Sequence, residues 1–154
     1  MIRRRDLITL LGGAAAWPLA ARAQQGDRVW RIGYLDASDE NPLAKSDFSE
    51  FTQVLAGLGW TDGRNVRIDA RWGGGDVNRI RAFAQELVGL QPDIIVASTT
   101  LAIAALLRET RTIPIIFAGV SDPVANGLVP RLNQPGGNIT GFSHLRTHFG
   151  RQVA

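Results

Sequence analysis

Cysteine is absent from the 154-residue sequence, and histidine occurs only twice, at His144 and His148. Without cysteine, the chain can form neither a disulfide framework nor a thiolate metal site. The two histidines are four residues apart, a spacing that can seat a metal on a helix, but no third ligand stands near them. We therefore predict no metal and no cofactor, and we interpret both histidines as part of a solvated tail.

Signatures of common enzymes are missing as well. The sequence has no GxSxG nucleophile motif, no GxGxxG fingerprint, and no glycine loop followed by Lys-Ser or Lys-Thr. No serine, histidine and aspartate arrangement suggests a hydrolase. We predict no catalytic residue and interpret the chain as a non-enzymatic protein.

Excess positive charge is confined to the first 23 residues. Arg3, Arg4, Arg5 and Arg22 stand there against a single acid, Asp6. Of the totals of 17 basic and 14 acidic residues, 13 of each sign then remain, so the rest of the chain is neutral. Nucleic-acid binding needs a clustered basic face, which this distribution does not indicate. No nucleic-acid partner is predicted.

The N-terminal segment has the three parts of an export signal. A basic start at residues 3–5 precedes an apolar stretch at 7–16, and Ala21-Arg22-Ala23 fits the small-x-small cleavage pattern. This pattern predicts a signal peptide at residues 1–23, and the arginines before Asp6 suggest a twin-arginine signal, with Sec export as the alternative. The mature chain would then be periplasmic. The alternative is an amphipathic helix or an uncleaved anchor.

From residue 29 onward, short apolar runs alternate with helical patterns. Runs of this kind are typical of strands buried on both faces of a parallel sheet. The strands are expected at 29–35, 66–72, 93–97, 115–118 and 139–142, and the helices at 48–58, 77–89, 101–109 and 124–132, with a loop over 36–47. This alternation predicts an α/β domain over residues 24–143, with a doubly wound parallel five-stranded sheet. We expect the strand order 2-1-3-4-5, with 66–72 near an edge because its apolar and charged residues alternate.

A run of three glycines, residues 73–75, follows the second strand. A glycine loop before a helix can cradle a phosphate, but the residues that complete such a motif are missing. We favour a flexible connector, with Asp76 or Asn78 as the N-cap of the next helix.

Two polar loops follow the third and fourth strands. Ser98, Thr99 and Thr100 stand where a helix begins, so hydroxyls and free N–H groups there could bind a carboxylate, or one of them could simply cap the helix. Ser121 and Asp122 follow the fourth strand, and Asp122 could accept bonds from an ammonium group or cap the helix expected after Pro123. Together these loops would suit a zwitterion such as an amino acid.

Several stretches resemble the substrate-binding proteins of ABC transporters, in the branch called tryptophan/tyrosine-type. They include RIGYL, GLGWTDGRNVRIDARW, PDIIVASTT, TIPIIFAGVSDPV and PGGNITGFS. The resemblance implies a periplasmic-binding-protein fold of type I, in which two lobes close on a small ligand and deliver it to an ABC permease in the membrane. It also implies ligand contacts in the first lobe at Ser38, Thr99, Thr100, Ser121 and Asp122.

The chain departs from this family in three respects. The family is roughly twice as long, in two similar lobes, so we expect a single lobe truncated before the missing second one, with a divergent tail at 144–154. Leu101 stands where the family usually has proline, and Asp36 where a small polar residue is common. The alternatives are a truncated remnant without function, or a receiver-like signalling domain, which would need an aspartate where Ser98 stands.

Overall fold

The computed structural model describes residues 28–131 and 136–143 of the chain. In these residues, strands and helices alternate from β1 to β4 as the sequence predicts, and β5 follows β4 without a helix between them. They are β1 (Trp30–Asp36), α2 (Pro42–Gly57), β2 (Val66–Trp72), α3 (Val77–Gly89), β3 (Ile94–Ala97), α4 (Thr100–Glu109), β4 (Ile115–Val120) and β5 (Ile139–Ser143). The predicted signal peptide at 1–23 and the predicted tail at 144–154 lie outside the described residues.

The strands form one parallel sheet in the order β2-β1-β3-β4-β5, which confirms the predicted topology. β2 lies at an edge, as its alternating pattern indicates, and β1 lies between β2 and β3. From β1 the chain passes to β2 on one side and then returns to add β3 on the other side, so the order of the strands reverses between β1 and β3. In open sheets of this kind, ligands bind beyond the carboxyl ends of the strands at such a switch point.

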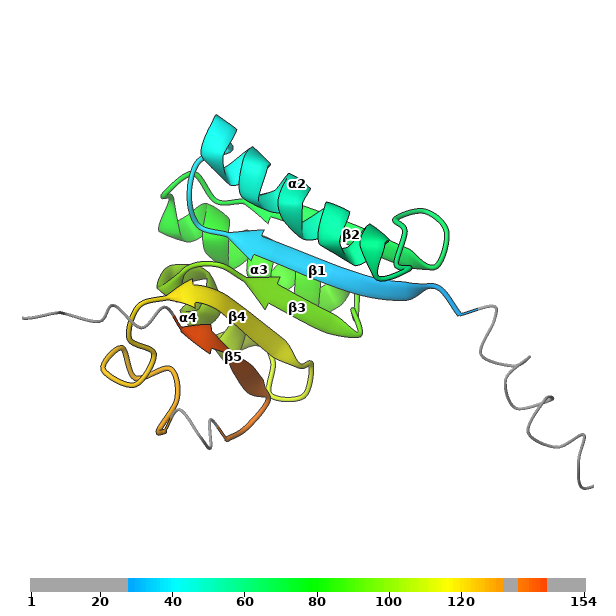
Figure 1. Ribbon diagram of the computed structural model, residues 1–154. Helices are drawn as coiled ribbons and strands as arrows, with labels where there is room; N and C mark the ends of the chain where they lie inside the picture. Colours follow the sequence, from blue (N-terminus) through cyan, green and yellow to red (C-terminus); the bar gives the residue numbers. More distant parts are fainter. Residues whose placement is uncertain (1–27, 132–135, 144–154) are drawn as a thin grey trace, which may run out of the picture.

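The main core lies between the sheet and the pair α3 and α4, which cover the same face (Figure 1). Leu35, Ile95 and Ile115 point into this core from three strands and are completely buried. Leu106 of α4 and Leu87 of α3 are also completely buried against them. Burying side chains of this size is the dominant favourable term in folding.

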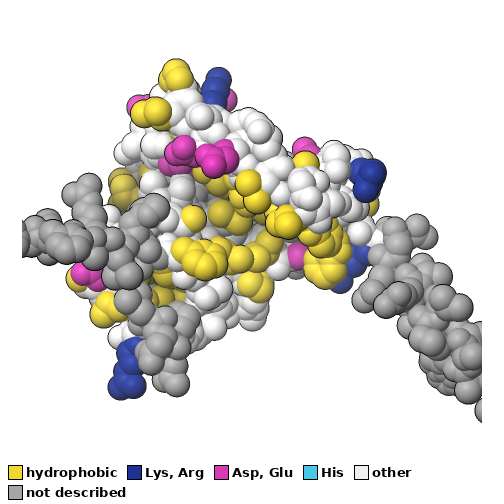
Figure 2. All heavy atoms as spheres, viewed as in Figure 1, with side chains coloured by type: hydrophobic (Ala, Val, Ile, Leu, Met, Phe, Trp, Pro, Cys, Tyr) yellow, Lys and Arg dark blue, Asp and Glu magenta, His cyan; other side chains and the backbone are white. Residues whose placement is uncertain are grey.

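On the opposite face, α2 lies over the β1 and β2 side of the sheet (Figure 1). Tyr34 of β1 packs there against Phe48 of α2, with ring centroids 5.0 Å apart, and Phe48 packs edge-on against Trp72 of β2 at 5.3 Å. No helix of the described residues covers β3 to β5 on this face, and Phe142 is 77 % exposed. Apolar side chains gather on the same face in the space-filling view (Figure 2).

Helix α2 begins six residues earlier than predicted. The segment 36–47 was expected to be a loop, but helix α2 starts at Pro42. The Asn41 side chain caps it, because its oxygen accepts hydrogen bonds from the N–H groups of Leu43 and Ala44, both at 3.0 Å. Asparagine at the N-cap followed by proline at the first helical position is a strong start signal. The expected loop therefore ends at Asn41.

The predicted helix at 124–132 was wrong over its described part. Residues 123–127 form a turn instead, closed by hydrogen bonds from Asn126 N to Asp122 O (3.1 Å) and from Leu128 N to Pro123 O (2.9 Å). Gly127 has a φ of +67°, a left-handed conformation that interrupts a right-handed helix. The turn directs Leu128 and Val129 into the core, where both are buried.

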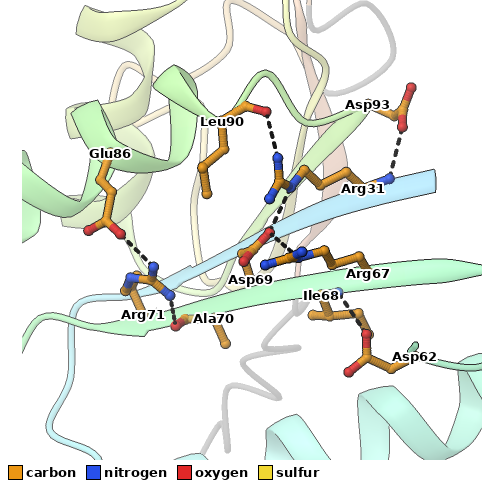
Figure 3. A network of polar contacts seen from close by, with 10 residues as sticks. All are labelled: Arg31, Asp62, Arg67, Ile68, Asp69, Ala70, Arg71, Glu86, Leu90 and Asp93. Carbon is orange, nitrogen blue, oxygen red and sulfur yellow. Dashed lines mark hydrogen bonds and ion pairs between the residues drawn. The ribbon is translucent and has the colours of Figure 1, made fainter. Parts of the chain in front are cut away.

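The charged residues of β2 are part of a structural network on the α3 side of the sheet (Figure 3). Arg31 of β1 donates from Nε to Asp69 Oδ2 at 2.8 Å and from Nη1 to the Leu90 carbonyl oxygen at 3.2 Å. Arg71 of β2 bonds Glu86 of α3 in the same view. These pairs connect β1, β2 and α3, so the charges that alternate along β2 have partners within the fold.

Helix α3 is capped by Asp76, as predicted, and this cap makes stability dependent on pH. The N–H groups of Arg79 and Asn78 donate to the carboxylate at 3.0 and 2.8 Å, and they hold the pKa of Asp76 below its ordinary value. Because the pKa of Asp76 is lower in the folded state, the stabilisation that its ionised carboxylate gives to the fold is fully present above the unfolded-state pKa, about 3.9. It is lost as the pH falls through the folded-state pKa.

We expect the melting temperature of the Asp76→Asn variant to fall less steeply below pH 4 than that of the wild type. Asparagine is also a good N-cap but does not titrate in this range. Thermal unfolding by circular dichroism across an acidic pH series measures both slopes. If the melting temperatures of the two proteins fell with equal slopes, titration of Asp76 would not contribute to the loss of stability in acid.

Two structural features are absent from the described ranges. No helix there is long and apolar enough to cross a bilayer. No group of three His, Cys, Asp or Glu residues among them is arranged to hold a metal ion.

Candidate ligand-binding site

A cleft of about 540 Å³ opens at the carboxyl ends of β1, β3 and β4, beside α2. Its volume is in the range of small-molecule sites. The lining comes from the ends of the three strands, the loops that follow β1 and β3, and one side of α2. It consists of Tyr34, Asp36, Ser38, Asp47, Phe51, Val96, Ser98, Thr99, Ala118 and Gly119.

Asp36 joins the loops that follow β1 and β3. Its side chain is at the end of β1 and the residue is only 7 % exposed. Oδ1 accepts hydrogen bonds from Ser38 N at 2.7 Å and Ser38 Oγ at 2.6 Å. Oδ2 accepts a hydrogen bond from Ser98 Oγ at 2.7 Å. One carboxylate therefore holds both loops in place through three neutral donors.

The glycine run after β2 supports the loop that follows β1 through backbone hydrogen bonds. Gly73 N donates to the Asp36 carbonyl oxygen at 2.8 Å, and Gly74 N and Gly75 N donate to the carbonyl oxygens of Ser38 and Ala37 at 2.9 and 2.7 Å. Gly74 and Gly75 both have positive φ, which turns their N–H groups toward the loop. This run is therefore a brace for the cleft, in the place where we expected a flexible connector.

Thr99 caps helix α4 and adds a further link between the loops. Its Oγ1 accepts hydrogen bonds from Ala102 N at 3.4 Å and from Ala37 N at 3.3 Å. Thr99, the N-cap of α4, lines the cleft. A helix N-terminus of this kind favours negative charge.

Aromatic rings form the wall of the cleft on the α2 side. Tyr34 and Phe51 lie 5.8 Å apart between ring centroids, and Tyr34 is 5 % exposed. Burial raises the pKa of the Tyr34 phenol; Ser98 acts in the opposite direction, and the negative charges of Asp36 and Asp47 raise it further. The phenol thus remains protonated at neutral pH, in an environment that disfavours negative charge.

The structure brings together two of the five residues predicted to bind ligand. Ser38 and Thr99 line the cleft, whereas Thr100 is the first residue of α4 and does not line it. Ser121 and Asp122 lie in the turn after β4, where Asp122 Oδ1 accepts a hydrogen bond from Ala125 N at 2.9 Å. At the end of β4, Ala118 and Gly119 line the cleft instead. The role of these five residues in binding stays a prediction.

Sequence reasoning missed the side of the cleft that α2 provides. Asp47 and Phe51 line it, and they are four residues apart on one side of the helix. The helix expected at 48–58 includes Phe51 but not Asp47, because residues 36–47 were interpreted as a loop, so the side of the helix that the two residues share could not be recognised.

The link through Asp36 makes a prediction about stability. Asparagine at this position presents an amide nitrogen to one of the two serines. That nitrogen carries hydrogens, so it cannot accept the hydrogen bond that the serine hydroxyl donates to the carboxylate. We expect Asp36→Asn to lower the free energy of unfolding by about 1–3 kcal/mol, because a buried donor is left unsatisfied. Asp47→Asn is the control, since Asp47 is exposed and should change stability by less than about 0.5 kcal/mol. Urea unfolding would measure both, and equal effects would show that Asp36 does not hold the loops.

Comparison with known proteins identifies the family. Residues 40–152 match the family model described as ABC transporter substrate binding protein. A tyrosine-binding protein of Clostridioides difficile (strain R20291) is 36 % identical over 104 residues, which are 68 % of this chain and 30 % of that protein.

Solved structures agree with this assignment. An ABC domain from Streptococcus pneumoniae in complex with L-Trp superimposes with a TM-score of 0.69 at 31 % identity, covering 75 % of this chain and 38 % of that one. The ligand-free, open structure of a substrate binding protein with adhesive properties from Clostridium difficile gives a TM-score of 0.69 at 33 % identity, covering 75 % and 39 %. This chain therefore spans less than half the length of the relatives it matches. The match over most of its residues shows that it belongs to the family of ABC transporter substrate-binding proteins.

Proposed function

We propose that this chain is one lobe of an extracytoplasmic substrate-binding protein that holds an amino acid for an ABC importer. The observation that carries the proposal is the cleft at the carboxyl ends of β1, β3 and β4, which is lined by Thr99, the N-cap of α4, and by the carboxylates of Asp36 and Asp47. The N-terminus of α4 and the Thr99 hydroxyl suit a carboxylate. Asp36 and Asp47 suit an ammonium group. A zwitterion satisfies both.

The kind of amino acid follows from the wall of the cleft. Tyr34 and Phe51 present apolar rings beside the polar groups, a surface that suits an aromatic side chain. The related proteins named for tyrosine and crystallised with L-Trp support the same class of ligand. We propose L-tryptophan or L-tyrosine as the first ligands to test.

The experiment is thermal unfolding of the purified chain against a panel of L-amino acids. A ligand that binds the folded state raises the melting temperature by mass action. We expect a saturable rise with aromatic amino acids and none with L-glutamate, because two carboxylates already line the cleft. A single lobe supplies only part of an enclosing site, so the dissociation constant should be near the millimolar range, about −4 kcal/mol. A cooperative melt unchanged by every amino acid would contradict this function for the chain.

Export and delivery form a separate part of the proposal. We propose that residues 1–23 direct the chain to the periplasm, where an ABC permease is its membrane partner. Cell fractionation with N-terminal sequencing of the periplasmic form should give Gln24 as the first residue. Retention of Met1 in a cytoplasmic product would contradict export.

A further inference from the structure

The charged side chains that line the cleft are all acidic. Asp36 and Asp47 line it, and no lysine, arginine or histidine is among the ten lining residues. The ion pairs formed within the described ranges involve neither of these aspartates. Asp36 is more than nine-tenths buried, and a buried carboxylate is normally paired with a cation or a metal ion. The three hydrogen bonds to Asp36 come from neutral groups, so a cation in the cleft would supply the opposite charge.

The serine hydroxyls point to the same conclusion. A carboxylate can only accept hydrogen bonds, so Ser38 and Ser98 both donate their hydroxyl hydrogens to Asp36, at 2.6 and 2.7 Å. Neither hydroxyl has a second hydrogen to give to a ligand. Each oxygen offers only lone pairs to the cleft, which suits a donor such as an ammonium group. The sequence alone suggested the reverse, that hydroxyls in these loops donate to a carboxylate.

The aromatic wall completes a site for positive charge. A ring face attracts an ammonium group within about 6 Å of its centroid, by about 0.5–2 kcal/mol. Tyr34 and Phe51 stand beside the two aspartates, and acidic side chains border the apolar surface on this face of the molecule (Figure 2). Burial is the main cause of the raised pKa of the Tyr34 phenol, and the negative charges of Asp36 and Asp47 add to it.

We propose that the ligand group held by this lobe is an organic ammonium, seated between Asp36 and Asp47 against the rings of Tyr34 and Phe51. The proposal rests on the proposed function and specifies which end of the amino acid this lobe recognises. The amine is the group required for binding, and the carboxylate at the α4 N-terminus is the lesser contact. An aromatic amine without a carboxylate should therefore still bind.

Three probes with one ring system separate the two ends of the ligand. Tryptamine carries only the amine, indolepropionate only the carboxylate, and L-tryptophan both. Each is titrated into the ¹⁵N-labelled chain while the backbone amide signals of Ser38, Ser98 and Gly119 are followed by NMR. We expect saturable shifts with tryptamine and L-tryptophan, and an affinity for indolepropionate at least about tenfold weaker, which corresponds to about 1.4 kcal/mol.

A pair of variants on α2 tests the charge directly. Asp47→Asn removes a carboxylate that is exposed and makes no hydrogen bond within the described fold, so the fold should be preserved. We expect it to weaken tryptamine binding about fivefold, the size of a partly exposed ion pair. Glu50→Gln removes the same charge from an exposed position of α2 outside the cleft, and it should leave the affinity unchanged.

The outcomes separate this inference from the function on which it rests. If L-tryptophan and indolepropionate bind and tryptamine does not, the ammonium assignment is overturned and the amino-acid function stands. An affinity for tryptamine unchanged by Asp47→Asn, or lowered equally by both variants, also overturns it. If none of the three probes shifts the signals, the proposed function and the ammonium assignment are both overturned.

Discussion

Replacing Ile95 by alanine is expected to lower the free energy of unfolding by about 2–5 kcal/mol. Ile95 lies on the inner strand β3 with no exposed surface, and it packs in the core beneath α3 and α4. The substitution removes buried methyl groups and leaves a cavity that the neighbouring strands can fill only in part. For a domain of this size, that loss is a large share of the total stability. Urea unfolding followed by far-ultraviolet circular dichroism measures it.

The neighbouring residue provides a matched control. Ile94 has the same side chain but points to the opposite face of β3, where it is only half-buried. Ile94→Ala should cost clearly less than Ile95→Ala, about 1 kcal/mol, because the cost follows the apolar area removed from contact. Equal losses for the two variants would show that α3 and α4 do not enclose the main core.

Replacing Gly73 by alanine is expected to disturb both stability and the cleft. A Cβ atom at Gly73 would lie 2.3 Å from Ile80 Cγ1, far closer than two carbon atoms can approach. Ile80 is 2 % exposed and cannot swing aside. Overpacking of this kind costs about 1–3 kcal/mol. Because Gly73 N bonds the Asp36 carbonyl oxygen, the displacement should reach the loop that carries Ser38.

A second glycine separates this clash from a general effect of added bulk. A Cβ atom added at Gly89, at the end of α3, would meet no heavy atom within 4 Å, and the residue does not have a positive φ. Gly89→Ala should raise stability by about 0.4–1 kcal/mol through the unfolded state. Chemical denaturation gives both values, and NMR of the Ser38 amide reports on the loop. If Gly73→Ala left that signal and the stability unchanged, the glycine run would not brace the cleft.

Much of the fold could be predicted from short-range patterns. The buried strands β3 and β4 are continuous apolar runs, and β2 alternates because one of its faces carries Arg67, Asp69 and Arg71. The errors arose where a single residue decides the local structure. Asn41 caps a helix inside a segment that looks like a loop, and Gly127 breaks a segment that looks helical.

The site was harder to predict than the fold. The hydroxyl loop after β3 and Ser38 were identified from the sequence, and the structure places Ser38 and Thr99 in one cleft. Thr100 and the Ser-Asp pair after β4 do not line it, and Ala118 and Gly119, at a register shift between β4 and β5, line it instead. Asp47 and Phe51 could not be assigned before α2 was placed over β1.

The sequence by itself determined the order of the elements and of the strands, because apolar periodicity and chain connectivity are local properties, and its short motifs indicated the family by resemblance. Only the tertiary structure decided which groups in the cleft donate and which accept. Asp36, Ser38 and Ser98 are adjacent to β1 or β3, and only the pairing of those strands brings them together. Because the carboxylate takes both hydroxyl hydrogens, Ser38 and Ser98 can only accept further hydrogen bonds in the cleft.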